Sequence, residues 1–269
     1  MSTESIKLVR AAEADVPGIL EYLSSDIPNC LYLYLDIFTY GVKDPNIIVW
    51  FGKDGDKIAL VIMKYYDGFQ IYSDRKDLDL TPVIEKIDEY DIDRFYARKD
   101  IIERLEPRYS DRYFSEYGKI VELKKYRVMK GIERVEEATE EDIPEIVDLL
   151  LTDDMRKATY TKKELEDQMI ERFRTGMGAS YIIRENGIIV AHLGIAAQTD
   201  KFRVAALTMV HTEYRNTLYG TLVDSYLINV LGKDGKRAFS FMTDERRIKM
   251  FLMMGDEVAA EYGKLIKRK

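Results

Sequence analysis

The sequence predicts a mixed α/β fold built from two similar halves. Helical and extended patterns alternate along the chain, and one helix-start pattern from the first half recurs in the second. The composition, 46% hydrophobic and 33% charged residues, is that of a globular protein with a sizeable core. A length of 269 residues is enough for two domains.

Charge and cysteine content exclude several classes of partner and site. The net charge is −7 and the basic residues are scattered, so we expect no nucleic-acid partner. The longest apolar runs are far too short to span a bilayer, so we expect no membrane partner. Cys30 is the only cysteine, which excludes an intrachain disulfide and a cysteine-based metal cluster. We therefore expect a cytoplasmic protein and no metal site.

The repeated pattern is a helix start. Residues 10–26 can be laid over residues 137–153, with Asp15-Val16-Pro17 falling on Asp142-Ile143-Pro144. In each copy an acid-rich turn leads to an aspartate placed to cap a helix, and a proline follows at an early helical position. Two unrelated helix starts would also give this match, so the segments that follow each copy decide between the readings.

After the first copy, the sequence predicts three strands in a meander and then an α/β alternation. Two β-like runs in 46–66 are joined at Asp54-Gly55, a hairpin signal, and a third run follows. A helix, a strand, a helix and a strand are then expected, over 81–90, 94–98, 100–109 and 119–128. We predict a domain of residues 1–128, followed by a second domain of residues 129–269.

After the second copy, the same order of elements is predicted. Residues 161–176 form a helix with Leu165, Met169 and Phe173 at four-residue spacing, and a hairpin follows at Asn186-Gly187. A third strand is predicted over 202–210.

A helix is expected directly after this strand, starting near residue 217. Leu218, Leu222, Tyr226 and Val230 recur every four residues and predict its buried stripe. Free N–H groups in its first turn, together with the helix dipole, make an anion site that a pyrophosphate could occupy.

The segment TMVHTEYRNTLYGT, residues 208–221, resembles motif A of the GCN5-related N-acetyltransferases (GNATs), a strand, then Arg/Gln-x-x-Gly-x-Gly/Ala, then a helix. Arg215 and Gly220 match this pattern, whereas Leu218 stands at the first glycine. Residues 237–256 resemble the final strand and helix of that family, with Gly255 as the glycine of its Gly-Phe pair. The resemblance covers 132–269, and the first half resembles a degenerate copy. It implies two tandem GNAT-like domains, each a mostly antiparallel sheet flanked by helices.

The resemblance also implies a cofactor site in the second half. The backbone of Thr208, Met209 and Val210 would hold the pantetheine arm and thioester of acetyl-CoA. The pyrophosphate site would be formed by Arg215, Asn216, Thr217, Leu218, Tyr219, Gly220 and Thr221. If position 218 required a positive φ, a leucine there would cost about 1–2 kcal/mol.

The implied activity is an acetyl-CoA-dependent N-acyltransferase that moves an acetyl group to a primary amine, on a small molecule or a peptide, by direct attack in a ternary complex. Acetyl transfer needs a neutral amine and a proton route, and no base is evident. Glu213, Glu185 and His211 are candidates by position only, while His192 and His211 are expected to be packing or surface residues.

The family's tyrosine acid would fall at Phe251, and Asp256 replaces the phenylalanine of the Gly-Phe pair. These departures leave an alternative open, a non-catalytic acyl-CoA-binding pseudoenzyme or an interaction module.

Overall fold

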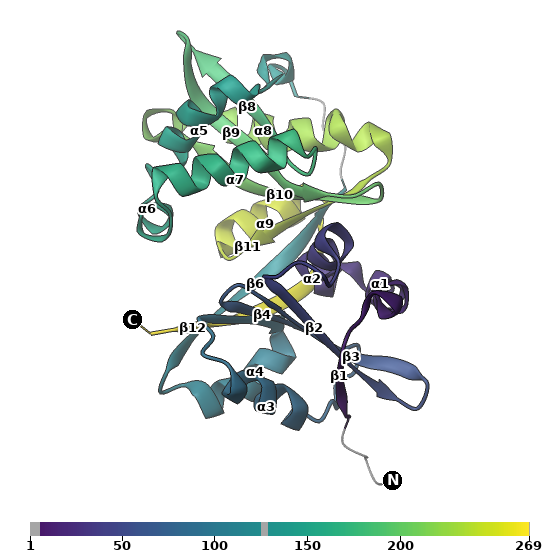
Figure 1. Ribbon diagram of the computed structural model, residues 1–269. Coiled ribbons are helices and arrows are strands. Elements are labelled where there is room, and N and C mark those ends of the chain that lie inside the picture. Colours follow the sequence, from purple (N-terminus) through teal and green to yellow (C-terminus); the bar gives the residue numbers. More distant parts are fainter. Residues whose placement is uncertain (1–5, 125–128, 269) are drawn as a thin grey trace. The chain divides into compact units, whose positions relative to one another are not determined.

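The computed structural model describes residues 6–124 and 129–268 and divides the chain into two compact units (Figure 1). Of the described residues, 6–120, 242–244 and 258–268 form the first unit, and 121–124, 129–241 and 245–257 form the second.

The first unit is a mixed sheet with helices on both faces. In this unit the strand order is β1-β2-β3-β4-β5-β12-β6, and β4 and β5 are parallel. Its elements in chain order are β1 (Leu8–Arg10), α1 (Val16–Ser24), α2 (Ile27–Tyr40), β2 (Ile47–Asp54), β3 (Lys57–Tyr65), β4 (Gly68–Tyr72), α3 (Thr81–Glu89), β5 (Arg94–Arg98), α4 (Lys99–Tyr109), β6 (Tyr113–Leu123) and β12 (Glu257–Lys267).

Alternation along β4 separates the two faces of this sheet. Phe69 and Ile71 belong to the hydrophobic core that contains the apolar residues of α3 and α4. On the other face, Gln70 Nε2 donates to Asp36 Oδ2 at 2.8 Å and Tyr72 OH donates to Asp26 Oδ2 at 3.1 Å. The first unit therefore has an apolar layer on one side of β4 and polar contacts to α2 and to its N-cap residue on the other.

The second unit is a mixed sheet of the order β6-β11-β10-β9-β8-β7, in which β10 and β11 are parallel. Its remaining elements in chain order are β7 (Glu136–Glu137), α5 (Ile143–Leu150), α6 (Asp154–Thr159), α7 (Lys162–Arg174), β8 (Ala179–Glu185), β9 (Ile188–Gln198), β10 (Phe202–Val210), α8 (Tyr219–Asn229), β11 (Arg237–Met242) and α9 (Glu245–Met253).

Helices cover both faces of the second sheet. Ile182 of β8 lies in a core with the apolar residues of α5 and α7. Tyr181, the preceding residue, points to the opposite face, where its ring centroid lies 5.2 Å from that of Tyr226 of α8. Figure 1 shows α5 and α7 in front of the strands and α8 behind them.

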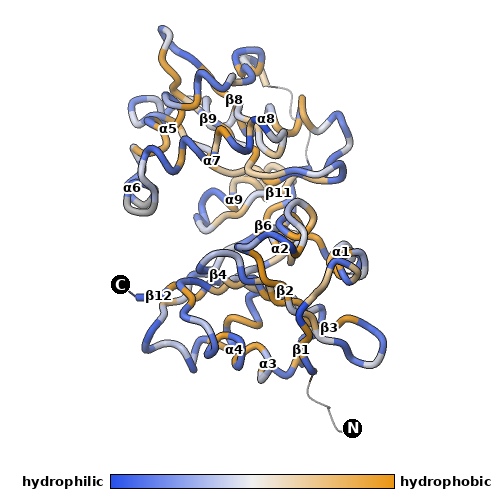
Figure 2. Tube along the Cα trace, in the orientation of Figure 1, coloured by the Kyte–Doolittle hydropathy of each residue, from blue (hydrophilic) through white to orange (hydrophobic). Residues whose placement is uncertain are grey.

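Hydrophobic residues follow the strands rather than the turns. In Figure 2 strand β2 is largely hydrophobic, whereas the turn that joins it to β3 is hydrophilic. Within residues 6–124 and 129–268, the helices are all too short or too polar to cross a membrane.

The predicted hairpins and helix starts are present, with one difference in detail. Asn186 and Gly187 have φ values of 51° and 82°, as a tight two-residue turn requires. Asp15 and Asp142 each end a 3₁₀ turn, and each accepts a hydrogen bond of 2.8 Å from the N–H three residues earlier. Each stands at the N-cap of the following α-helix, as predicted, but its side chain makes no cap hydrogen bond there and instead fills the third position of a capping box of the preceding turn.

The compact units do not follow a single cut in the sequence. Residues 125–128, where the first predicted domain ends, lie outside the described residues. Strand β12, placed by the sequence in the domain of residues 129–269, belongs to the first unit from residue 258. It pairs with β5 in an antiparallel register from Tyr262↔Arg98 to Ile266↔Arg94, and its Leu265 is fully buried in the first core.

Candidate active site

The parallel strands β10 and β11 are paired over only part of the length of β10. Their register runs from Phe202↔Arg237 to Ala205↔Ser240, and β10 continues beyond it to Val210. The last five residues of β10 therefore extend past the parallel ladder.

The corresponding parallel strands of the first unit stay together to their ends. Pairing of β4 with β5 runs from Gly68↔Arg94 to Ile71↔Ala97. Beyond it, Arg98 Nη1 donates to the carbonyl of Ser73 at 2.8 Å and ties the two strand ends to each other. Within the described residues, β4 and β5 therefore do not separate at their ends as β10 and β11 do.

A β-bulge interrupts β10 at the start of this extension. The pairing with β9 passes from Ala206↔Gly194 to Met209↔His192, so Leu207 and Thr208 face one residue of β9. Leu207 has a φ of 58°, a left-handed conformation that costs a leucine about 1–2 kcal/mol.

A tight loop leads from β10 into α8. Tyr214 N–H donates to the carbonyl of His211 at 2.8 Å, and Thr217 N–H donates to that of Tyr214 at 3.0 Å. Helix α8 begins at Tyr219, two residues after the predicted start, and the described residues offer no acceptor to the N–H groups of Gly220 and Thr221. These two donors lie at the positive end of the helix dipole, so this end of α8 suits an anion.

Leu218 stands at the N-cap of α8 without backbone strain. Its φ is −82°, so the predicted cost of a positive φ does not arise. The predicted buried stripe is wrong at both ends, because Leu218 is 62% exposed and Val230 is 36% exposed. Leu222, Val223 and Leu227 are buried in the helix itself, whereas Leu218 lies before its first residue, at the N-cap, with its side chain in solvent.

Gly220 is a position of close approach between α8 and β10. A Cβ at this position would lie 3.3 Å from Cγ2 of Val210, tighter than most van der Waals contacts. A side chain at this site would require Val210 to move by a few tenths of an ångström, so glycine fits the close approach of the helix start to the end of the strand.

Solved structures with nearly the whole of this architecture are known. A Drosophila protein is 11% identical with a TM-score of 0.68, over 97% of this chain and 98% of its own. A GCN5-related N-acetyltransferase from Sphaerobacter thermophilus is 13% identical with a TM-score of 0.67, over 97% and 95%. A tandem GNAT protein from the clavulanic acid biosynthesis pathway, solved without AcCoA, is 12% identical with a TM-score of 0.60, over 97% and 98%.

The chain has the tandem GNAT fold. At these identities the likeness concerns the fold alone. No protein-family model and no curated protein sequence matches the chain.

Within this GNAT fold, the predicted cofactor residues lie along one continuous path. Thr208, Met209 and Val210 form the end of β10, and the segment from Arg215 to Thr221 forms the turn and the first residues of α8. Arg215 is exposed, and its guanidinium makes no hydrogen bond or ion pair with the described part of the chain. Free N–H donors, a free guanidinium and the close approach at Gly220 fit a diphosphate group.

Among the predicted bases, Glu185 is engaged by neighbours at the start of α8. Its carboxylate accepts hydrogen bonds from Tyr219 OH and from Arg134, and these two donors lower the pKa of Glu185. The Arg134 guanidinium also lies 4.9 Å from the centroid of the Tyr219 ring. A carboxylate held in this way is a weak base, so its place in the structure favours a role in fixing Tyr219.

The other two bases predicted by position lie in the loop before α8. His211 Nδ1 accepts a hydrogen bond of 3.4 Å from the N–H of Glu213, and its ring meets that of Tyr214 edge to face. Glu213 is exposed to solvent. Neither residue is in a geometry that identifies it as the base.

His192 is in the core. Its side chain has no exposed surface, and burial lowers its pKa to about 4, so the ring is neutral at pH 7. It lies in hydrogen-bond distance of the Leu207 carbonyl and of the Ser180 hydroxyl. A histidine inside the apolar run of β9 was the only sequence signal for this cluster.

The position of the expected tyrosine acid is occupied by a core residue. Phe251 of α9 is fully buried, and the Arg247 guanidinium lies 5.5 Å from its ring centroid. The helix ends at Met253, and Gly255 in the turn that follows has a φ of 91°, which suits glycine. Asp256 is buried and accepts a hydrogen bond of 2.9 Å from the N–H of Lys124, so it has a structural role.

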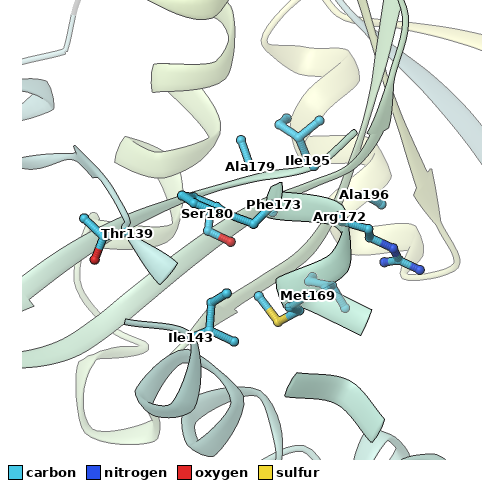
Figure 3. Close-up of a pocket in the computed structure, with 12 residues that line it drawn as sticks. Thr139, Ile143, Met169, Arg172, Phe173, Ala179, Ser180, Ile195 and Ala196 are labelled. Atoms are coloured by element: carbon cyan, nitrogen blue, oxygen red, sulfur yellow. The ribbon is translucent and has the colours of Figure 1, made fainter. Parts of the chain in front are cut away.

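A small pocket lies on the α5–α7 side of the bulge (Figure 3). Its cavity volume of about 20 Å³ is room for about one water molecule. The pocket is lined by Thr139, Ile143, Met169, Arg172, Phe173, Gly178, Ala179, Ser180, Gly194, Ile195, Ala196 and Leu207. It is too small for an amine substrate in this conformation.

Proposed function

We propose that the chain is an acetyl-CoA-dependent N-acyltransferase whose active unit is the second one. An acetyl group would pass to a primary amine, on a small molecule or a peptide, by direct attack in a ternary complex. The proposal includes a cytoplasmic location, which agrees with a single thiol, Cys30, that is buried and free.

The observation that carries this proposal is the opening of the sheet beside the start of α8. The parallel ladder stops at Ala205↔Ser240, β10 continues, and the unbonded N–H groups of Gly220 and Thr221 lie at the end of that extension. A strand with free main-chain groups suits a pantetheine arm, and a helix start with free donors suits a diphosphate. In the described part of the first unit the parallel strands stay together at Arg98, so we assign this unit a structural role.

Residues of the second unit would have two roles, binding of the diphosphate and positioning of the thioester. N–H groups at the start of α8, with the Arg215 guanidinium, would hold the diphosphate of acetyl-CoA, the cosubstrate that supplies the thioester. Main-chain groups of Thr208, Met209 and Val210 would orient the arm and the thioester. We assign no side chain as the base, and an amine could lose its proton to water.

Binding of acetyl-CoA, measured by calorimetry, tests the proposal. Gly220→Glu places a carboxylate beside the diphosphate site and a side chain against Val210, so it is expected to abolish binding. Gly18→Glu is the matched control, because Gly18 is exposed in the first unit and a Cβ there meets no atom within 4 Å. Release of the CoA thiol over a panel of amines then measures turnover. Equal affinities for the two variants, or no binding by the wild type, would refute the assignment.

A second candidate, a non-catalytic acyl-CoA-binding protein, is favoured by the buried Phe251 and by the engaged carboxylate of Glu185. It predicts saturable binding without thiol release from any amine in the panel. An interaction module without a ligand site predicts neither.

A further inference from the structure

A buried side-chain cluster supports the bulge of β10 from within the sheet. His192 of β9 lies with Nδ1 2.8 Å from the carbonyl oxygen of Leu207 and with Nε2 3.0 Å from Oγ of Ser180. Because a carbonyl only accepts, Nδ1 carries the proton and Nε2 accepts from the serine hydroxyl. Both nitrogens are therefore used, and the ring is fixed in one tautomer.

The neighbouring residues leave this ring and the bulge little freedom. The ring of His192 has no exposed surface, and the positive charge of Arg156 helps to lower its pKa. At Gly194 a Cβ would lie 3.0 Å from the carbonyl of Ala206, 3.2 Å from Cε1 of His192 and 3.4 Å from Cβ of Leu207. His192 and Gly194 of β9 therefore pack closely against the bulge of β10, where Leu207 has its left-handed conformation.

The hydrogen bond from His192 sets the direction of one peptide group. The peptide between Leu207 and Thr208 is planar and trans, so its carbonyl and its N–H point in opposite directions. Since the carbonyl points to the His192 ring, the N–H of Thr208 points away from that ring. Strand β10 lies between β9 and β11, and its pairing with β11 has already ended at Ala205, so the ladder with β11 does not use this N–H.

We propose that His192 is a positioning residue for acyl transfer, because it anchors the Leu207 carbonyl and thereby aims the Thr208 N–H at the place of the acyl carbonyl. This inference rests on the proposed function and goes beyond it. Thr208 supplies the donor that contacts the substrate, and His192 acts through it. A donor aimed at a developing oxyanion is a large contribution to catalysis of acyl transfer, typically about 10²–10³-fold in kcat.

Two amide variants separate this role from a merely structural one. In His192→Asn the side-chain amide can reach the place of Nδ1 and still donate to Leu207. In His192→Gln the longer side chain carries its amide to the place of Nε2, near Ser180, and the Leu207 carbonyl loses its donor. Both variants put a neutral amide in the core, so each serves as the control for the other.

We expect kcat to fall at least about tenfold in His192→Gln and to be retained within about threefold in His192→Asn. The affinity for CoA without an acyl group should not change in either variant, because the diphosphate site lies at α8. The preference for acetyl-CoA over CoA should fall about two- to tenfold in His192→Gln alone. Equal losses of kcat in both variants, or a full kcat in His192→Gln, would overturn the proposal.

A measurement without ligand keeps the test separate from the proposed function. The imidazole ¹⁵N shifts should show a neutral Nδ1–H tautomer for His192, and the only other histidine, His211, can be assigned by substitution. An Nε2–H tautomer would overturn the anchor whatever the protein binds. Failure of the wild type to bind acetyl-CoA would instead remove the proposed function, and the role in acyl transfer with it, while a Nδ1–H tautomer would leave the anchor standing.

Discussion

Two residues of the second unit, Leu218 and Leu207, show that the backbone conformation at a position determines whether a leucine there is strained. Leu218 replaces a glycine of the motif, yet its φ of −82° is ordinary for a leucine. No sequence pattern distinguishes Leu207, yet this residue has the left-handed conformation. The motif could be predicted from Arg215 and Gly220. The bulge could not, because its cause is a contact between two strands.

Replacement of Leu218 by glycine tests whether this position limits the affinity for acetyl-CoA. Because Leu218 is unstrained and 62% exposed, Leu218→Gly should relieve nothing, and the affinity should stay within about threefold, or about 0.7 kcal/mol. Calorimetry on the two proteins provides the comparison. A tenfold gain in affinity would mean that the leucine obstructs the site after all.

His192 should make the protein sensitive to acid. Its pKa is about 4 in the folded chain and 6.5 without burial, so between these values the unfolded chain binds a proton that the folded chain does not. The free energy of unfolding should therefore fall as the pH drops from 6.5 toward 4, by up to about 1.4 kcal/mol per pH unit from this group.

Urea denaturation across that pH range, for the wild type and for His192→Asn, isolates this contribution, since the carboxylates are common to both proteins. The curve of the variant should be flatter. Parallel curves would show that His192 does not take up a proton on unfolding.

At the scale of elements, the two halves of the sequence have the same order of helices and strands except for the additional helix α6, but they differ in how their parallel strands pair. The order was predictable from the repeated helix starts and from the hairpin signals at Asp54-Gly55 and Asn186-Gly187. The difference lies in how far the two parallel strands stay paired. It depends on Arg98 in the first unit and on the bulge in the second, and neither has a local pattern in the sequence.

Removal of the Arg98 contact should loosen the first unit. The Arg98 side chain is 11% exposed, donates to Ser73 and pairs with Asp100, so Arg98→Met should lower the free energy of unfolding by about 1.5–3 kcal/mol. Arg75→Met is the matched control, because Arg75 pairs with Asp54 in an exposed position where such a pair contributes about 0–1 kcal/mol. Similar losses of free energy of unfolding in the two variants, measured by urea denaturation, would show that the contacts of Arg98 stabilise the fold no more than an exposed ion pair does.

At the scale of the whole molecule, the number of units was predictable and their composition was not. Hydrophobic patterning indicates that a strand is buried but not in which of two similar sheets it pairs. Leu265 and its strand β12 complete the core of the first unit. In the sequence, however, they follow the second unit, and the continuous segment of the first unit ends at residue 120.

Separate expression of residues 1–128 and 129–269 should therefore fail to give two stable domains. The first fragment lacks β12, which pairs with β5, and the second carries that strand without its partner. We expect the first fragment to show no cooperative thermal transition by circular dichroism, while the full chain does. Addition of a peptide of residues 257–268 should restore the transition. A first fragment that melts cooperatively by itself would contradict this account of the core.

The return of β12 to the first sheet also constrains synthesis of the chain. A growing polypeptide exposes β5 as an open edge while the ribosome translates the entire second unit, and the gap can be closed only once Leu265 has left the exit tunnel. Such an edge recruits other strands, so nascent copies on one messenger would be at risk of joining each other. Demand for chaperones should accordingly last until β12 has emerged from the ribosome.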